Sequence, residues 1–125
     1  MFTIDYRSRV PIYDQIVNSV IRLKAVGVLK DGDKLPSVRY LAGQMNINPN
    51  TVQKAYAILE TSGVIYSVSG KGSFISGDET ATAAVLAAAA DEFKKAAEDA
   101  VRTGLSGSQL HDIIDSLLNG GQKND

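Results

Sequence analysis

Residues 46–60, "NINPNTVQKAYAILE", place a helix breaker directly before a helix-forming run. Asn48 is a residue type that caps the free N–H groups of a helix start, and Pro49 suits the first helical position because no donor is needed there. An apolar stripe then recurs at helical spacing, formed by Val52, Ala55, Tyr56 and Leu59. The pattern predicts a helix from Pro49 that buries this stripe and exposes a polar, weakly basic N-terminal face. Solvent alone commonly covers such a face, so its role depends on the neighbouring elements.

Two further helices are predicted upstream of this stretch. Pro11 begins the first, which Gly27 can end, and Ser37 caps a short one over residues 38–45. Their inward faces are Ile12, Tyr13, Ile16, Val17, Val20 and Leu23 in the first helix, and Val38, Leu41, Ala42 and Met45 in the second. The short helix, a brief Asn-Ile-Asn turn and the helix from Pro49 make a helix-turn-helix, and the first helix completes a three-helix core.

Alternating patterns predict extended structure in two places. Residues 65–68 and 73–76 alternate around the tip Ser-Gly-Lys-Gly at 69–72, which predicts a β-hairpin. Two glycines around Lys71 let the tip adopt positive φ and bring its backbone close to another molecule. Three helices followed by such a hairpin describe a winged helix-turn-helix. A second alternation opens the chain and predicts a short strand or extended arm with Phe2, Ile4 and Tyr6.

The chain after Asp78 is predicted to be helical and to pair with a second copy. An alanine-rich helix over about residues 80–103 ends at Gly104, and Ser106 or Ser108 caps a last helix. Two amphipathic helices alone form a poor core, so burial of both stripes predicts a homodimer. The residues expected at this interface are Leu86, Phe93, Leu110, Ile113, Ile114 and Leu117. The fold class is therefore mainly α (α+β), with a winged helix-turn-helix DNA-binding domain at residues 1–78 and a helical dimerisation domain at 79–125.

Composition limits the classes of protein that fit. The formal net charge of −1 conceals an asymmetry, because residues 1–78 hold nine Lys or Arg against six Asp or Glu, whereas residues 79–125 hold four against eight. A basic surplus of three permits nucleic-acid binding by the first part without requiring it.

The absence of Cys favours a reducing compartment, for which the cytoplasm is the default. The longest small or apolar run, residues 83–90, is too short to span a bilayer, and no signal-peptide pattern opens the chain, so no membrane partner is expected.

Enzymatic chemistry finds no support in the sequence. The tip "GKGS" resembles a phosphate-binding loop only superficially, since Ile65 stands where the first glycine is required and Gly72 follows the lysine. His111 is the sole histidine and has no nearby ligands in the sequence. No set of a nucleophile with a base and no cofactor motif is apparent, so we expect a protein that is not an enzyme and needs no metal or cofactor.

The candidate binding residues follow from the docking geometry of a helix-turn-helix, whose second helix presents its first residues to the major groove. Asn50, Thr51, Gln53 and Lys54 would lie against bases and phosphates there. Asn and Gln side chains can pair bidentately with adenine. Asn48 could cap the helix and also touch the DNA backbone, Arg39 could reach a guanine or a phosphate, and Lys71 could follow the backbone or enter the minor groove. Alternatively, Arg39 is a charged side chain that contacts only solvent. The alternative for Lys71 is that it stands in a flexible surface loop without a binding role.

The segments "PIYDQIVNSV", "GDKLPSVRYLA", "NPNTVQKAYAILETSGVI" and "GKGSFI" resemble the GntR family of bacterial transcription regulators, and match its YtrA-like subfamily best. The similarity covers residues 2 to about 76 in order and at family spacing. It implies a winged-helix dimer that binds an inverted-repeat operator and represses genes commonly encoding transport systems, often its own operon included. The positions that the resemblance assigns to DNA contact are Ser37, Arg39, Asn48, Asn50, Thr51, Gln53, Gly70, Lys71 and Gly72, to which Lys54 is added from the exposed face.

Departures from the family pattern bear on what is bound. Val38 and Tyr40 stand where many members have acidic residues, and Pro49 and Gln53 replace residues that are frequently basic in other branches. Fewer cations predict weaker phosphate attraction and a different base preference.

The alternative function is a winged-helix protein-interaction module without DNA binding. The tail is too small for a roomy pocket within one subunit, so a small-molecule effector would bind at the dimer interface.

Overall fold

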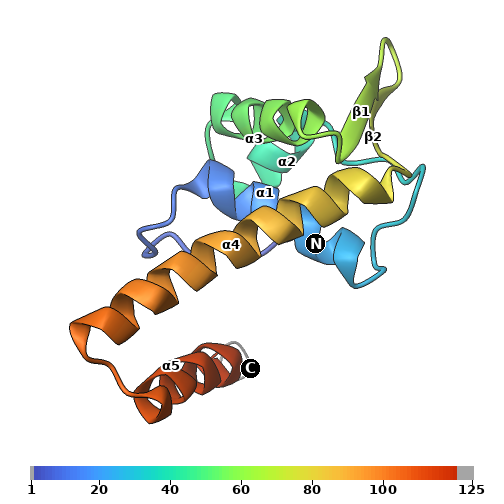
Figure 1. The fold of residues 1–125 in the computed structure, drawn as a ribbon. Coiled ribbons are helices and arrows are strands. Elements are labelled where there is room, and N and C mark those ends of the chain that lie inside the picture. The colour runs from blue at the N-terminus through green and yellow to red at the C-terminus, as the bar shows by residue number, and fades with distance from the viewer. Residues whose placement is uncertain (1, 121–125) are drawn as a thin grey trace. The chain divides into compact units, whose positions relative to one another are not determined.

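The computed structural model describes residues 2–120, which form five helices and one two-stranded antiparallel sheet (Figure 1). The elements are α1 (Ile12–Ala25), α2 (Val38–Met45), α3 (Pro49–Thr61), β1 (Ile65–Val68), β2 (Gly72–Ile75), α4 (Glu79–Thr103) and α5 (Gly107–Gly120). The order and bounds of these elements confirm the mainly helical α+β class and the winged helix-turn-helix. The chain divides into two compact units between Val85 and Leu86, and the domain limits expected around Asp78 stay a prediction.

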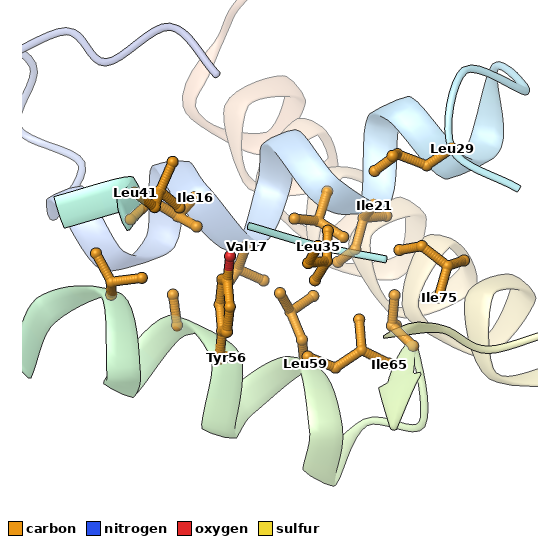
Figure 2. Packing of buried hydrophobic residues seen from close by; sticks show 14 of the residues in the cluster. Ile16, Val17, Ile21, Leu29, Leu35, Leu41, Tyr56, Leu59, Ile65 and Ile75 are labelled. Atoms are coloured by element: carbon orange, nitrogen blue, oxygen red, sulfur yellow. The ribbon is translucent and has the colours of Figure 1, made fainter. Parts of the chain in front are cut away.

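The core of the first unit is built by the apolar stripes that the sequence places on α1, α2 and α3. Helix α3 packs against both other helices, and Figure 2 shows its Tyr56 and Leu59 directed toward Val17 of α1. Buried residues also come from the segment between α1 and α2 and from both strands. The largest fully buried side chains are Ile16, Val20, Leu35, Val52, Leu59, Val64 and Ile75.

Tyr56 is a core residue, as its place on the apolar stripe predicts. Only 4% of the residue is exposed, and its hydroxyl donates a hydrogen bond of 2.7 Å to the carbonyl of Pro36. Burial disfavours the phenolate and raises the pKa of Tyr56 to about 12. The neutral hydroxyl therefore ties the segment before α2 to α3.

Both predicted caps of the helix-turn-helix are formed. The hydroxyl of Ser37 accepts from the N–H of Tyr40 at 3.1 Å, and the side-chain oxygen of Asn48 accepts from the N–H of Asn50 at 2.8 Å. Asn46 ends α2 in the left-handed region with φ 55°, a conformation that Asn tolerates better than most residues. These local bonds set the turn between α2 and α3.

The wing consists of β1, β2 and the turn at residues 69–71, and it projects beyond the helices in Figure 1. Its register pairs Ile65 with Ile75 and Val68 with Gly72, and the turn is closed by a 2.9 Å bond from the N–H of Lys71 to the carbonyl of Val68. Strand β2 begins at Gly72, one residue earlier than the alternation suggested.

Residues 32–35 line the other edge of β2, a pairing that the sequence did not reveal. The N–H of Gly32 donates to the carbonyl of Ile75, the N–H of Ile75 to Asp33, and the N–H of Leu35 to Ser73, at 2.8 to 2.9 Å. Lys34 is paired with Phe74. The segment before α2 therefore acts as a short third strand of the wing.

The opening segment is an arm packed on the helices, because the described residues before α1 contain no strand. Phe2 and Ile4 pack partly buried against the core, and the hydroxyl of Tyr6 donates to the carbonyl of Met45. Gln15 accepts from the N–H of Asp5 at 2.8 Å and donates back to its carbonyl at 2.9 Å. Of the two options that the alternation left open, the structure has the arm, which ends in a turn that begins at Tyr6.

Helix α4 begins within the first unit, which extends to Val85. The carboxylate of Asp78 accepts from the N–H groups of Thr80 and Ala81 at 2.9 and 3.2 Å, and Lys24 donates to the Asp78 carbonyl at 3.3 Å. Thr82 is 8% exposed, and its hydroxyl has no hydrogen-bond partner among the described residues. The start of α4 thus buries a polar group at an energetic cost.

Replacing Thr82 by valine should raise the free energy of unfolding by about 1 kcal/mol, because the shape is kept and the unpaired hydroxyl is removed. Urea denaturation of the full chain measures this change. The matched control is Thr80→Val, which alters an exposed position on the same turn and should leave stability within about 0.5 kcal/mol. A loss of stability in Thr82→Val would show that the hydroxyl has a partner in solution.

The second unit exposes most of its large apolar side chains. A reciprocal cap begins α5: the N–H of Gln109 donates to the Ser106 hydroxyl at 3.1 Å, and the N–H of Ser106 donates to the Gln109 side chain at 2.9 Å. This cap selects Ser106 over Ser108. No residue of α5 is fully buried in the described protomer. The exposed large apolar residues of the unit are Leu86, Phe93, Val101, Ile113, Leu117 and Leu118, whereas Leu110 and Ile114 are half-buried.

Among residues 2–120, no helix combines the length and apolar character that crossing a bilayer requires.

Candidate DNA-binding site

The N-terminal half of α3 carries the predicted major-groove residues. Asn50, Gln53 and Lys54 are exposed, and Thr51 is half-buried. The ammonium of Lys54 lies 3.9 Å from the centre of the Tyr13 ring on α1, within the range of a cation–π contact. This contact was not foreseen, and it holds the Lys54 charge beside α1 while the Asn50 and Gln53 side chains stay exposed.

Helix α2 contributes Ser37 and Arg39 at its start. The Ser37 hydroxyl is engaged as the helix cap, although the residue remains exposed. Arg39 is exposed as well, and its guanidinium makes no hydrogen bond or ion pair with any residue that the structure describes. A guanidinium without an internal partner can form a bidentate pair with a guanine or a phosphate.

The tip of the wing has the backbone that its glycines predict. Gly70 has φ 76° and Gly72 has φ 120°, conformations that other residues adopt only with strain. A Cβ at Gly70 would meet open space, whereas one at Gly72 would lie 3.0 Å from Cε of Lys34. The tip can therefore bring its backbone close to a ligand, with the exposed Lys71 between the two glycines.

A cleft of about 420 Å³ separates the wing from the start of α2. Its lining includes four of the residues that the resemblance assigns to DNA contact, namely Ser37, Gly70, Lys71 and Gly72. The structure thus brings the wing tip and the start of α2 to one cleft, although the two are more than 30 residues apart in the chain. The other predicted contact residues lie outside the lining, namely Arg39, Asn48, Asn50, Thr51, Gln53 and Lys54.

Sequence reasoning assigned no role to four further polar residues of this cleft: Lys34, Ser67, Ser69 and Ser73. The alternation places Ser67 and Ser73 on the hairpin strands and Ser69 at the tip, and it says nothing of Lys34. Only the pairing of residues 32–35 with β2 places Lys34 beside the wing, and no local pattern signals that pairing.

Among the described residues, no group of three or more His, Cys, Asp or Glu side chains is arranged to hold a metal ion. The arrangement instead offers amide groups on α3, a free guanidinium on α2 and a lysine between glycines on the wing, all of which suit DNA contact.

The comparisons with known proteins agree with this arrangement. The model of the bacterial regulatory proteins of the gntR family matches residues 12–75. The HTH-type transcriptional repressor YtrA of Bacillus subtilis (strain 168) is 40% identical over 130 residues, covering all of both chains. This similarity confirms the assignment to the family and to its YtrA-like branch that the sequence motifs indicated.

Solved structures show the same fold. A transcriptional antiterminator from Listeria monocytogenes EGD-e superposes with a TM-score of 0.73 at 37% identity, covering 94% of this chain and 89% of that one. The DNA-binding domain of AraR in complex with operator ORE1 gives a TM-score of 0.52 at 25% identity, covering 61% of this chain and 93% of that one. These relatives are regulators and not enzymes, as expected. The chain therefore belongs to the gntR family of bacterial regulatory proteins and is a DNA-binding transcriptional regulator.

Proposed function

We propose that the protein is a dimeric repressor that reads an inverted-repeat operator, one half-site for each protomer, in the cytoplasm where bacterial DNA lies. The exposed amides of Asn50 and Gln53 at the start of α3 and the exposed guanidinium of Arg39 on α2 carry this proposal. A two-fold dimer presents two such surfaces, and an operator with matching symmetry satisfies both. By resemblance to the YtrA-like branch, the repressed genes encode transport systems and include the regulator's own operon.

The exposed apolar residues of the second unit support the dimer. Leu86, Phe93, Ile113 and Leu117 are 47 to 70% exposed in the protomer, and Leu110 and Ile114 are half-buried. Apolar side chains gathered on two adjoining helices favour association, because burial removes them from water. A second copy supplies the same apolar residues in return. A small-molecule effector would bind between the two copies, and a metabolite screen that leaves operator affinity unchanged would contradict that part of the proposal.

The experiment that tests the function is selection of random duplex DNA by the purified full chain at moderate salt. We expect enrichment of a two-fold symmetric site and a steep fall in affinity with added salt, because neutralised phosphates release counterions. No enrichment by a folded, dimeric protein would contradict the proposal and favour the protein-interaction module.

Replacing Arg39 by alanine should cost about 1 to 3 kcal/mol of binding free energy on the selected operator, because a bidentate pair with guanine is lost. Fluorescence anisotropy on the operator and on a scrambled duplex of the same length measures this cost. Arg22→Ala is the control, since Arg22 is an exposed arginine on α1 and lies outside the candidate site. Equal weakening of Arg39→Ala on both duplexes would show that the side chain contacts phosphate and not a base.

A further inference from the structure

Tyr13 stands in the first turn of α1 and offers the face of its ring to a side chain of α3. The ammonium of Lys54 lies 3.9 Å from the centre of that ring. Tyr13 is half-buried and packs against the core, whereas Lys54 is exposed. The ring is therefore the fixed member of the pair, and the lysine is the side chain whose position the contact restricts.

The contact leaves the charge and the donors of Lys54 available. An ammonium has three N–H donors, and the ring occupies only the side that faces it. The ring attracts the cation through its quadrupole and does not neutralise it as a carboxylate would. Lys54 makes no ion pair with any residue that the structure describes. The ammonium is thus held in place while it remains free to bind an anion.

Holding a lysine in place before a ligand arrives favours binding. The lysine stem is flexible and has many rotamers, most of which are lost when the ammonium is held against a ligand. Contact with the Tyr13 ring incurs part of this loss when the chain folds. Less conformational freedom then remains to be lost when DNA binds, which is the general advantage of a pre-organised contact.

We infer that Tyr13 is a positioning residue for DNA binding, whose ring holds the Lys54 ammonium ready for a backbone phosphate. The inference rests on the proposed DNA-binding function, to which it adds a residue of α1 that the sequence assigned only to the core. A phosphate is the expected ligand because an ammonium is a compact point charge, whereas the neighbouring amides of Asn50 and Gln53 suit base edges. Tyr13 acts through Lys54 and not through its own hydroxyl.

Nuclear magnetic resonance of the free protein tests the contact itself. Protons over the face of an aromatic ring are shielded by its ring current. The terminal methylene protons of Lys54 should therefore resonate upfield of those of Lys30, an exposed lysine of the same unit. The difference should vanish in Tyr13→Leu and persist in Tyr13→Phe, which keeps the ring. No upfield shift in wild type would overturn the inference, because the ring would not hold the ammonium in solution.

A double-mutant cycle of Tyr13→Leu and Lys54→Gln tests the role in binding, with affinity measured on the selected operator and on a scrambled duplex. Alone, Tyr13→Leu should weaken binding about two- to fivefold per protomer, the range of an exposed cation–π contact. The loss should be equal on both duplexes, because a phosphate carries no base identity. In the Lys54→Gln background the same substitution should cause no further loss, since the side chain through which the ring acts is gone.

Three control variants accompany the cycle. Tyr13→Phe removes only the hydroxyl and should bind as wild type does, whereas Tyr13→Met is a second replacement without a ring and should match Tyr13→Leu. Lys54→Gln should lower the slope of log K against log salt by about 0.9 for each protomer. Lys30→Gln removes an exposed cation outside the candidate site and should leave that slope unchanged. Thermal unfolding of each variant verifies that the three-helix core is intact.

Each outcome decides a separate point. Equal losses from Tyr13→Leu in both backgrounds would mean that the ring only supports the packing of α1, and would overturn the inference. A loss in Tyr13→Phe as large as in Tyr13→Leu would assign the effect to the hydroxyl and overturn it as well. Tighter binding by Tyr13→Leu would overturn it by showing that the ring withholds the cation from DNA. In these three cases wild type still binds the operator and the proposed function stands, whereas no binding of wild type to either duplex overturns both.

Discussion

Replacing Leu117 by aspartate is expected to lower affinity for the symmetric operator by about 10²-fold or more, because the two half-sites are then bound by separate protomers. Leu117 is 70% exposed in the protomer, so the substitution should leave the fold of each chain intact. A charge placed in an apolar interface between two copies must be desolvated, which favours the dissociated state. Analytical ultracentrifugation measures the dimer, and anisotropy measures the affinity.

Ser116→Asp is the control for this substitution, because it adds the same charge at the neighbouring exposed position of α5. We expect it to remain dimeric and to bind the operator as wild type does. A Leu117→Asp protein that is still dimeric, with operator affinity unchanged, would place the interface elsewhere. A monomer with unchanged affinity would contradict the proposal that two joined protomers read the operator.

Replacing Leu59 by alanine should lower the free energy of unfolding by about 2 to 5 kcal/mol. The side chain is fully buried among α1, α3 and the strands, so truncation removes apolar burial and leaves a cavity (Figure 2). Urea denaturation followed by circular dichroism gives the change, with Glu60→Ala as the exposed control on the same helix. A loss below about 1 kcal/mol would show that the surrounding side chains collapse into the space.

The features predicted correctly from the sequence are those set by nearby residues. Caps act over two or three residues, so Ser37 and Asn48 mark the starts of α2 and α3, and both caps are formed in the structure. The glycines of the wing tip signal its positive φ angles in the same local way. The sequence left Ser106 and Ser108 as alternative caps of α5. The structure distinguishes them, because the Ser106 N–H donates to the Gln109 side chain and the Gln109 N–H donates to the Ser106 hydroxyl.

Features that depend on residues distant in the chain could not be predicted. The contact of Lys54 with Tyr13, the bond from Tyr6 to Met45 and the pairing of Lys34 with Phe74 each join residues about 40 positions apart. A periodic pattern shows which face of an element is buried, but it does not identify the partner on another element. The predicted contacts on α3 and the wing tip stay predictions, and the cleft with Lys34 emerged only when the chain was folded.

The pairing of residues 32–35 with β2 has a consequence for how this chain can change in length. Side chains alternate between the two faces of a strand, so one inserted residue in this segment would turn Lys34 to the opposite face. Leu35, which is 2% exposed, would leave the core at the same time. Insertions and deletions should therefore be rare in residues 32–35 during evolution.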